Sequence, residues 1–540
     1  MSLVKDIAPL IHGEIMEDEA SLLRASKDAS LFTVRPKAVA HPMNVEDIKT
    51  LVRYATSHTD VSLTARSGGT DMSGGPLSES IVVDMTTHFT RIGRVTGSSI
   101  HVEPGVYYRN MERKVRKKGL LMPSYPASKE ICTVGGMVNN NAGGEKTLSY
   151  GKTERYVEEL SVVLADGNEY TISPLTPTEL AKKMKEKTFI GKVYREMYAL
   201  LEKNYDFIHS KKPDVSKNSA GYYLWNVWDR KTFDLTKLFV GSQGTLGITT
   251  NIKFRLIKPK KHSALLVVFL HNLSSLIGIV EYLLAYQPTS LESYDDHTLA
   301  LALKLFPSFV KKLKTNLFSL GWQFLPEFFI MARHGIPKLI LLAEFSGDTK
   351  KEAISQAEAA QNAIKKWNVP TRIATSKDEQ KKYWTIRRES FNMLRHHVQG
   401  KRTAPFIDDF IVKPMHLEKF LPGLARILKK YNIDYSIAGH VGDGNFHIIP
   451  LMDLKKEHEH TIIPKVSKEV YDLVFRYQGS STAEHNDGLV RSHVLPQMYG
   501  EKMYNLFKET KAIFDPKNIF NPRKKVNFNW KWSQEHIAHE

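Results

Sequence analysis

Two histidines, His440 and His447, stand on either side of the turn sequence Gly-Asp-Gly-Asn. The segments that flank them are rich in β-branched and aromatic residues, which is typical of short strands. Asp443-Gly444 is a strong signal for a two-residue hairpin turn, which would place His440 directly opposite His447. Directly paired side chains have Cβ atoms roughly 5 Å apart, a spacing that lets two imidazoles bind one metal ion. An ordinary hairpin with two unrelated histidines is the alternative interpretation at this point.

A second group of residues with chemical potential is a glycine loop. Residues 65–77, ARSGGTDMSGGPL, follow an expected strand and contain two glycine pairs. Successive backbone N–H groups in such a loop form an anion-binding nest, and glycine lets the backbone curl closely around a phosphate. The loop is neither G-x-G-x-x-G nor a G-K-[ST] phosphate loop, so a Rossmann NAD site and a nucleotide triphosphatase are not indicated. A plain glycine-rich surface turn is the other interpretation.

Two further stretches are also rich in glycine and small polar residues. Residues 125–153 are dense in Gly, Asn and Ser, and residues 241–249 read GSQGTLGIT. A long polar, glycine-rich connection inside a compact domain is usually functional. These stretches therefore belong with the first loop as candidates for a ligand site.

The elements that must position these loops alternate between helix and strand. Asn44 precedes an apolar-periodic segment with an acid at the third helical position, which predicts an N-capped helix over 44–58 and a strand after it. The Pro- and Lys-rich stretch 258–263 is a plausible domain boundary. Two strand–helix blocks follow it, which indicates an α+β layer with helices on one face. We expect four parts, namely a helical N-terminal arm (1–34), two domains (35–258 and 259–480) and a C-terminal segment (481–540).

Composition narrows the class of protein. A chain of 540 residues with 42% apolar residues can build a large core. The single Cys132 excludes a disulfide framework, a thiolate zinc site and an intrinsic iron–sulfur cluster, and it fits a reducing compartment. The N-terminus has no apolar signal-peptide core, and the longest apolar region, 263–286, is expected to be a strand and then a helix. We expect a cytoplasmic protein.

The net charge is +18, and lysines dominate and are scattered along the chain. A basic surface can hold nucleic acid or an anionic membrane. No helix-turn-helix, zinc-finger or aromatic-basic RNA motif accompanies the charge, so we expect no nucleic-acid binding. A solvated lysine-rich surface is the plainer interpretation.

The motifs taken in order resemble a known family. The first half of the chain resembles the PCMH-type FAD domain of the vanillyl-alcohol-oxidase fold. The motifs that carry this likeness are, in order, R-S-G-G-T, P-A-S, T-V-G-G, N-A-G-G, Y-G-K-T and G-T-L-G-I. GHVGDGNFH and EHNDGLVRSHVLPQMYG resemble the FAD-binding D-lactate dehydrogenase and glycolate oxidase group, which includes D-2-hydroxyglutarate dehydrogenases. The likeness extends over about residues 35–525 and is more specific than any single motif. It implies an α+β fold, with a two-subdomain FAD-binding domain, a ferredoxin-like substrate cap and a C-terminal helical segment that returns to the flavin.

The resemblance implies a set of FAD contacts. The pyrophosphate loop matches at 66–71, and the other residues match positions along the diphosphate, flavin ring, adenine and ribose. The set is Arg66, Ser67, Gly68, Gly69, Thr70, Asp71, Pro126, Ser128, Thr133, Gly135, Gly136, Asn141, Gly151, Ile248 and Asn521. No histidine or cysteine occupies a clear attachment position, so we expect non-covalent FAD.

The resemblance also implies a metal and a base. His440 and His447 match the family's metal histidines, Glu484 the third ligand and His485 the adjacent base. Two histidines and a carboxylate leave positions open on a divalent ion, zinc or manganese, for the hydroxyl and carboxylate of a hydroxy acid. Arg387 fits the carboxylate-binding arginine, and its neighbour Arg388 is the competing candidate.

Four positions depart from the family's pattern. Gln243 replaces a glutamate, Asn486 replaces the glycine after Glu-His, and Arg523 replaces a glycine near the flavin ring. Ile407 stands where hydroxyglutarate-type members carry a substrate-contacting lysine, which weakens hydroxyglutarate as the substrate.

We expect an FAD-dependent dehydrogenase that oxidises a small D-2-hydroxy acid, with D-lactate favoured, to the 2-oxo acid and sends a hydride to flavin N5. The alternatives are a D-2-hydroxyglutarate or glycolate dehydrogenase, a non-redox flavoprotein like alkyl-dihydroxyacetone-phosphate synthase, and a flavin-binding subunit without turnover. With one cysteine the chain holds no iron–sulfur relay, so electrons go to an external acceptor, an iron–sulfur partner subunit or a quinone. The positive charge favours an acidic partner or peripheral association with the inner face of a membrane. The oligomeric state stays open.

Overall fold

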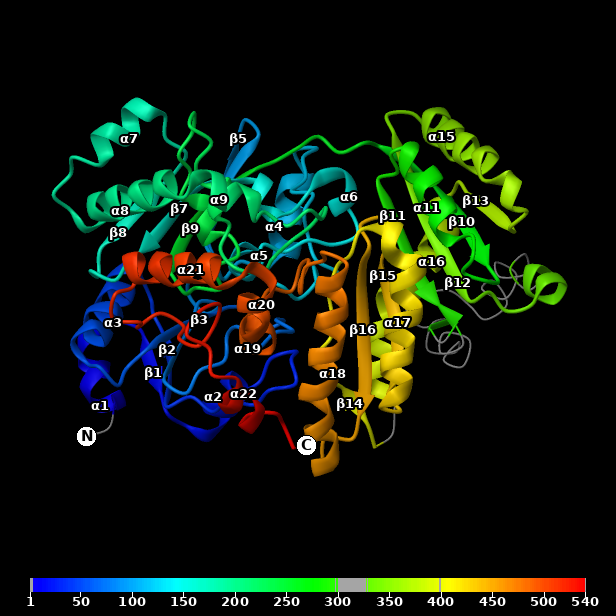
Figure 1. The fold of residues 1–540 in the computed structure, drawn as a ribbon. Coiled ribbons are helices and arrows are strands. Elements are labelled where there is room, and N and C mark those ends of the chain that lie inside the picture. Colours follow the sequence, from blue (N-terminus) through cyan, green and yellow to red (C-terminus); the bar gives the residue numbers. More distant parts are fainter. Residues whose placement is uncertain (1–2, 297, 300–326, 328, 398–399, 540) are drawn as a thin grey trace.

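The structure, a computed structural model, describes residues 3–296, 298–299, 327, 329–397 and 400–539. Its strands form three sheets (Figure 1). The four-stranded sheet has the order β1 (Glu14–Met16), β2 (Ala38–His41), β4 (Ile81–Asp84), β3 (Leu63–Arg66). The five-stranded sheet has the order β5 (Ile92–Thr96), β6 (Ser99–Val102), β9 (Ile248–Arg255), β7 (Val157–Val163), β8 (Glu169–Ile172). The seven-stranded sheet has the order β13 (Thr371–Ala374), β10 (His262–Leu270), β12 (Leu339–Gly347), β11 (Ser290–Asp295), β15 (Asp434–His440), β16 (Asn445–Met452), β14 (Arg402–Thr403).

The four-stranded sheet ends at the glycine loop. Helix α3 (Val45–Ser57) begins where the sequence predicts, with the Asn44 side chain accepting from the backbone N–H of Asp47 at 3.0 Å. Its apolar face packs on β2 and β4, and β3 then delivers Arg66 to the start of the loop. The N-terminal arm is not purely helical, because β1 pairs antiparallel with β2 and extends this sheet.

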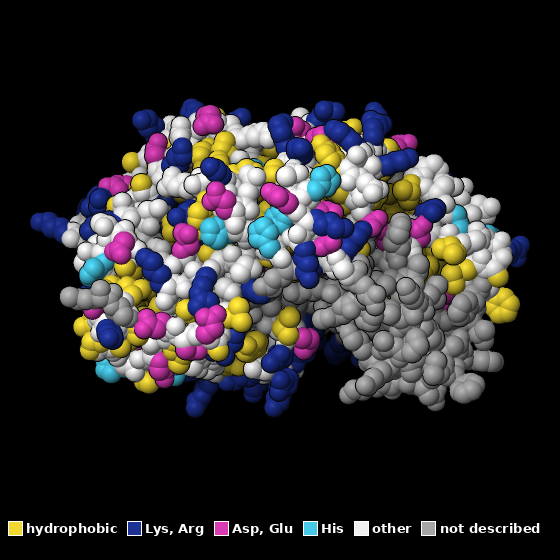
Figure 2. Space-filling model, turned by 90° about the horizontal axis from the view of Figure 1, so that it is seen from below, with side chains coloured by type: hydrophobic (Ala, Val, Ile, Leu, Met, Phe, Trp, Pro, Cys, Tyr) yellow, Lys and Arg dark blue, Asp and Glu magenta, His cyan; other side chains and the backbone are white. Residues whose placement is uncertain are grey.

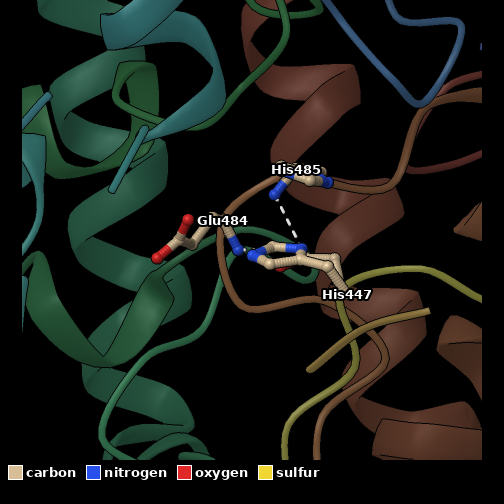
Figure 3. Close-up of side chains that lie close together, drawn as sticks. His447, Glu484 and His485 are labelled. Carbon is tan, nitrogen blue, oxygen red and sulfur yellow. Dashed lines mark hydrogen bonds between the residues drawn. The ribbon is translucent and has the colours of Figure 1, made fainter. Parts of the chain in front are cut away.

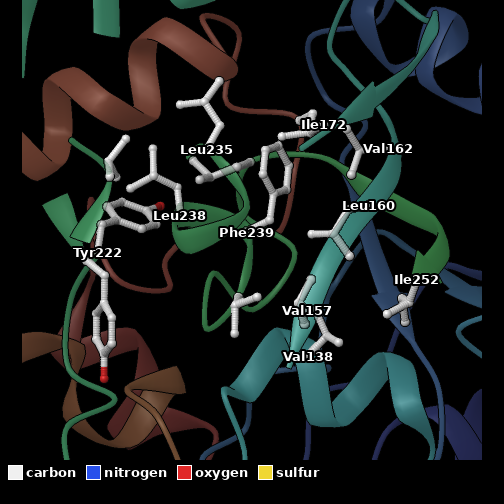
Figure 4. Packing of buried hydrophobic residues seen from close by; sticks show 14 of the residues in the cluster. Val138, Val157, Leu160, Val162, Ile172, Tyr222, Leu235, Leu238, Phe239 and Ile252 are labelled. Carbon is white, nitrogen blue, oxygen red and sulfur yellow. The ribbon is translucent and has the colours of Figure 1, made fainter. Parts of the chain in front are cut away.

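The five-stranded sheet has the largest apolar core on one of its faces. Figure 4 shows Leu160, Val162, Ile172 and Ile252 of this sheet around Phe239. Helices α5 (Val134–Asn140), α8 (Phe189–Lys203) and α21 (Glu501–Phe514) add apolar residues to the same core. Helix α21 of the C-terminal segment therefore packs in this half of the molecule.

The seven-stranded sheet is covered on both faces. Residues 264, 266, 268 and 270 of β10 belong to an apolar core on one face of the sheet, to which helices α11 (Leu276–Ala285), α15 (Lys350–Ala363), α17 (Leu417–Lys430) and α18 (Glu457–Arg476) also contribute. The alternate residues 265, 267 and 269 face the start of α16 (Lys377–His397). Burial of both faces explains the unbroken apolar run of β10. The expectation of helices on one face only is therefore wrong, because α16 covers the other.

The outside of the molecule is charged and mixed. On the face drawn in Figure 2, basic side chains are spread out and interspersed with acidic ones rather than gathered in one field. Within the ranges that the structure describes, no helix has both the length and the apolar character needed to cross a bilayer.

Candidate functional site

A cavity of about 950 Å³ lies where the glycine loops meet the seven-stranded sheet. Most of the FAD contacts predicted from the sequence line it, namely Arg66, Ser67, Gly68, Gly69, Thr70, Asp71, Pro126, Ser128, Thr133, Gly135 and Gly136. His440, His447, Glu484, His485, Arg387 and Arg388 line the same cavity from the other side. The structure thus brings the two predicted groups to one space, whose volume is in the range of ligand and cofactor sites.

The glycine loop is built for close backbone approach. Gly69 has a φ of +63°, and a Cβ there would lie 2.5 Å from Nη2 of Arg66. A Cβ on Gly68 would lie 3.0 Å from the carbonyl oxygen of Ile131. The hydroxyls of Thr133 and Ser67 tie the loop to the start of α5 with a 2.6 Å hydrogen bond. The positive φ of Gly69 and the tight space at Gly68 favour glycine at both positions, where backbone N–H groups without side chains can approach a diphosphate closely.

Four predicted FAD contacts do not line the cavity. Ile248 is buried in the apolar core, and the Asn141 side chain accepts from the backbone N–H of Glu154 at 3.0 Å. Gly151 has a φ of +73° at the end of a short helix, where a Cβ would meet the Arg155 side chain. Asn521 donates to the carbonyl oxygens of Gly75 (2.9 Å) and Gln243 (2.6 Å). These residues hold the loops that line the cavity.

The departures from the family pattern have local explanations. Asn486 and Arg523 have φ values of 68° and 67°, so they occupy the left-handed conformation that favours glycine, where asparagine is the best-tolerated replacement. The amide of Gln243 donates to Ser73 Oγ at 3.0 Å and accepts from the backbone N–H of Gly488 at 2.8 Å. Ile407 is buried in the core of the seven-stranded sheet and does not line the cavity.

The histidine hairpin differs from its predicted register. His440 pairs with Asn445, and His447 pairs with Ala438, so the two histidines are diagonal rather than directly opposite. A two-residue type I′ turn needs positive φ at both central residues, and only Gly444 has it here. The Asp443 carboxylate instead accepts from Ser216 at 2.7 Å, outside the turn. Because side chains alternate along a strand, His440 and His447 still share one face, with ring centroids 5.2 Å apart.

Each of the three imidazoles is held through Nδ1 by a buried carboxylate. Glu292 on β11 lies 2.5 Å from Nδ1 of His440. Asp408 bridges the other two, with its oxygens 3.1 Å from Nδ1 of His447 and 2.6 Å from Nδ1 of His485. A carboxylate can only accept, so Nδ1 carries a proton in either protonation state, and Nε2 is the nitrogen that can lose its proton to serve as a ligand or base.

The segment that carries Glu484 and His485 is fixed by Asp409. One oxygen of Asp409 accepts from the backbone N–H groups of Ala483, Glu484 and His485 at 3.0, 2.9 and 2.8 Å. As a result, Glu484 projects toward the hairpin, where its Oε2 is 3.4 Å from Nε2 of His440. Figure 3 shows Glu484, His485 and His447 gathered around one space.

The electrostatics of this cluster favour positive charge. Burial lowers the pKa of His440, but the charges of Glu292 and Glu484 outweigh it and raise that pKa to about 9. Burial also lowers the pKa of His485, but the charges of Asp409 and Asp408 outweigh it and raise that pKa to about 9. Burial prevails at His447, whose pKa is lowered. The pKa of Glu484 is well below its usual value, since His440 and Lys217 outweigh the effect of burial.

The donor set fits a divalent cation. One ligand atom from each of Asp409, His447, Glu484 and His485 lies within 4.8 Å of the others. His440, which the sequence predicts as a ligand, is not part of this group, although its Nε2 is 3.4 Å from Oε2 of Glu484. The Asp409 oxygen that holds the loop is already saturated by hydrogen bonds, which leaves the imidazoles and Glu484. Nitrogen and carboxylate donors with neighbouring carboxylates on Nδ1 are the usual surroundings of zinc.

The two candidate arginines face different partners. Arg387 on α16 lies 3.0 Å from Glu292, the same carboxylate that holds His440. Arg388 forms a paired contact with Glu145 at 2.6 and 2.9 Å, on the side of the glycine-rich stretch. Arg387 is therefore the arginine next to the histidine cluster.

Sequence reasoning missed Glu292, Asp408 and Lys217. Lys217 is completely buried and donates to Oε1 of Glu484 at 2.5 Å. All three are far in sequence from the residues they hold, since Glu292 is 148 positions from His440 and Lys217 is 267 from Glu484. The acidic pair Asp408-Asp409 directly after an apolar run was the one local signal of a buried polar site.

Comparison with known proteins decides the family. A model of the C-terminal domain of FAD-linked oxidases matches residues 259–525, and a model of an FAD-binding domain matches residues 36–173. The chain belongs to the family of FAD-linked oxidases. The two matches contain the histidine cluster and the first two glycine-rich stretches of this FAD-linked oxidase, respectively.

Relatives along almost the whole chain carry several names. The D-2-hydroxyglutarate dehydrogenase of Pseudomonas putida is 27% identical over 525 residues, which are 95% of this chain and 50% of the relative. The glycolate oxidase subunit GlcD of Bacillus subtilis is 27% identical, covering 94% of this chain and 93% of the relative. The D-lactate dehydrogenase of Archaeoglobus fulgidus is 26% identical, covering 94% of each. This FAD-linked oxidase thus spans about half the length of the Pseudomonas putida relative.

A solved structure confirms the fold class of this FAD-linked oxidase. A p-cresol methylhydroxylase superimposes with a TM-score of 0.68 at 16% identity, over 97% of this chain and 96% of that one. The PCMH-type FAD-binding architecture with a second α+β domain, expected from the motifs, is therefore correct.

Replacing Gly69 with valine should abolish FAD binding, because the new side chain would meet Arg66 and block the backbone from a diphosphate. Gly97→Val is the matched control, since Gly97 has a similar φ of +59° but nothing within 4 Å of its Cβ position. Both variants carry the backbone strain of a β-branched residue at positive φ, about 1–2 kcal/mol. The measurement is the FAD content of the purified proteins after incubation with FAD. Equal FAD content in the two variants would contradict the assignment of the loop.

Proposed function

We propose that this chain is an FAD-dependent dehydrogenase that oxidises a small D-2-hydroxy acid, with D-lactate favoured, to the 2-oxo acid. The observation that carries the proposal is that the histidine–glutamate cluster and the glycine loops line one cavity. The relatives named D-lactate, D-2-hydroxyglutarate and glycolate enzymes support the substrate class.

The glycine-rich wall of the cavity suits FAD, because Gly68 and Gly69 present backbone N–H groups without side chains and leave little room for a Cβ. Bound FAD supplies a two-electron acceptor for the hydride of the substrate. Gly68, Gly69 and the Ser67–Thr133 pair would hold the cofactor's diphosphate from one side. No histidine or cysteine occupies a clear attachment position, so we expect the cofactor to be held without a covalent bond.

His440, His447 and Glu484 would hold the divalent ion, zinc or manganese. When bound, the ion supplies Lewis-acid polarisation of the substrate's hydroxyl and carboxylate oxygens. Glu292 and Asp408 fix the histidines so that Nε2 is the donor atom in each.

His485 is the general base in this proposal. In the neutral form of His485, Nε2 would take the proton of the substrate's 2-hydroxyl, and Asp408 on Nδ1 would stabilise the imidazolium that forms. Arg387 binds the substrate's carboxylate, which a planar guanidinium can grip with two hydrogen bonds. The hydroxyl proton and the hydride leave from adjacent atoms, and the 2-oxo acid results.

The wall next to the cluster favours a short substrate. Ser436 and Ala438 lie on the same face of β15 as His440, and Ile449 lies two residues beyond His447 on β16, so the wall is small and largely apolar. Arg387 would serve the first carboxylate, and the other arginine on this side, Arg388, is already paired with Glu145. A second carboxylate, as in D-2-hydroxyglutarate, would gain little here, which supports D-lactate over it.

The alternatives are a D-2-hydroxyglutarate or glycolate dehydrogenase, a non-redox flavoprotein, and a flavin-carrying subunit. The Asp408–His485 pair speaks against the last two, because proton abstraction is the chemistry that such a pair performs.

Anaerobic addition of D-lactate to the FAD-loaded protein should bleach the visible flavin band, and His485→Ala should slow this step by about 10²–10⁴-fold with FAD still bound. His101→Ala, at an exposed position of β6, is the control and should reduce its flavin at the wild-type rate. Stopped-flow absorbance measures both. Near-normal flavin reduction in His485→Ala would show that the base is another group, and no bleaching by D-lactate in the wild type would reject D-lactate as substrate.

Asp408→Asn should also slow flavin reduction by D-lactate, by about 10²-fold or more, without loss of FAD. The asparagine side chain has one accepting oxygen and one donating NH₂ group, whereas Asp408 accepts from both His447 and His485. The imidazole that faces the NH₂ group must therefore carry its proton on Nε2, and this nitrogen can then serve neither as a ligand nor as a base. Asp234→Asn, which replaces a buried carboxylate that accepts from Thr236, is the matched control. A wild-type rate in Asp408→Asn would remove Asp408 from the proposal.

Electrons should leave the flavin for an acceptor outside this chain, an iron–sulfur partner or a quinone, because its one cysteine cannot ligate a cluster. Steady-state turnover with D-lactate should proceed with quinone analogues and artificial dyes and should not reduce NAD. Fast NAD reduction with the dyes inert is the contrary result.

A further inference from the structure

Lys217 is a buried cation that connects the FAD-binding half of the molecule to the histidine hairpin. It lies in the stretch after α9 (Tyr205–Ser210), and its side chain is 0% exposed. Its Nζ donates to Oε1 of Glu484 at 2.5 Å and to Oδ1 of Asn445 at 3.2 Å, and it lies 3.3 Å from Oδ2 of Asp443. Three acceptors match the three N–H groups of an ammonium, so this buried charge is fully satisfied.

The contact makes the two oxygens of Glu484 unequal. Oε1 is engaged by Lys217, while Oε2 is 3.4 Å from Nε2 of His440. The other two partners of Lys217 belong to the hairpin that carries both histidines. Asp443 lies in its turn, and Asn445 is the first residue of β16. One side chain thus holds the glutamate and the hairpin in register.

We propose that Lys217 is a positioning residue that makes Glu484 a one-oxygen ligand of the divalent ion. The inference rests on the metal site of the proposed function. An ion with two imidazoles and one carboxylate oxygen keeps positions for the hydroxyl and the carboxylate of a hydroxy acid. A carboxylate free to bind through both oxygens would take one of those positions.

Loss of the lysine cation has a defined consequence. In Lys217→Met the side chain keeps a similar length, but Oε1 of Glu484 loses its donor and can turn toward the ion. The histidines and their carboxylates are not touched. The change therefore acts on the coordination of the ion rather than on the identity of its ligands.

The experiment uses FAD-loaded, metal-free protein titrated with Co²⁺, whose visible absorption reports the coordination number. Lys217→Met should bind Co²⁺ more tightly than the wild type, because the ion gains the second oxygen of Glu484 and no longer faces the charge of the lysine. Its visible band should also be weaker per bound ion than that of the wild type, as a higher coordination number produces. Lys511→Met is the matched control, because Lys511 is another buried lysine, paired with Asp515 at 2.5 Å, that contacts none of the metal residues.

Asp443→Asn is a second variant, which weakens the other anchor of Lys217 while leaving the lysine and Glu484 in place. It should change the Co²⁺ affinity and spectrum less than Lys217→Met does, with FAD content unchanged. If the wild type binds one Co²⁺ and Lys217→Met binds it with the same affinity and spectrum, the proposed role of Lys217 is wrong. The proposed function would still stand. A wild type that binds no Co²⁺ would reject the metal site and this inference together.

Discussion

The carboxylates that hold Nδ1 of the three imidazoles are the constraint on which the rest of this structure depends. A free imidazole can place its proton on either nitrogen, and its ring can turn. Glu292 on His440 and Asp408 on both His447 and His485 remove that freedom, because a carboxylate accepts and does not donate. Each Nε2 is then left available in a fixed direction.

Such a cluster of buried charges is stable only if every charge has partners. An unpaired buried carboxylate would cost several kcal/mol, so the protein surrounds these acids with donors. Asp409 is held by three successive backbone N–H groups, and the completely buried Arg491 donates to the carbonyl oxygens of Asp408 and Asn486. Lys152 reaches from the FAD-binding half to the carbonyl oxygen of Ala483 at 2.6 Å. The site is therefore complete only when the two halves of the molecule are docked.

Features that rest on local chemistry could be predicted from the sequence. The cap of α3, the glycine loop and the shared face of His440 and His447 all depend on neighbouring residues, and they are present. The hairpin register could not be predicted, because the Asp443 side chain serves Ser216 and Lys217 rather than its own turn. Glu292 and Lys217 were out of reach for a similar reason, since tertiary packing alone brings them to His440 and Glu484. Asn141 and Asn521 match the family's motifs, but the structure uses them to hold loops rather than to line the cavity.

The central claim is that His440, His447 and Glu484 meet around one ion at the end of the FAD cavity. The most direct test is a crystal structure of the FAD-loaded protein with zinc, with anomalous diffraction recorded on both sides of the zinc absorption edge. The account predicts one strong anomalous peak about 2.0–2.2 Å from Nε2 of both histidines and from a single oxygen of Glu484. Well-ordered FAD in the cavity with no anomalous peak at these residues would contradict it.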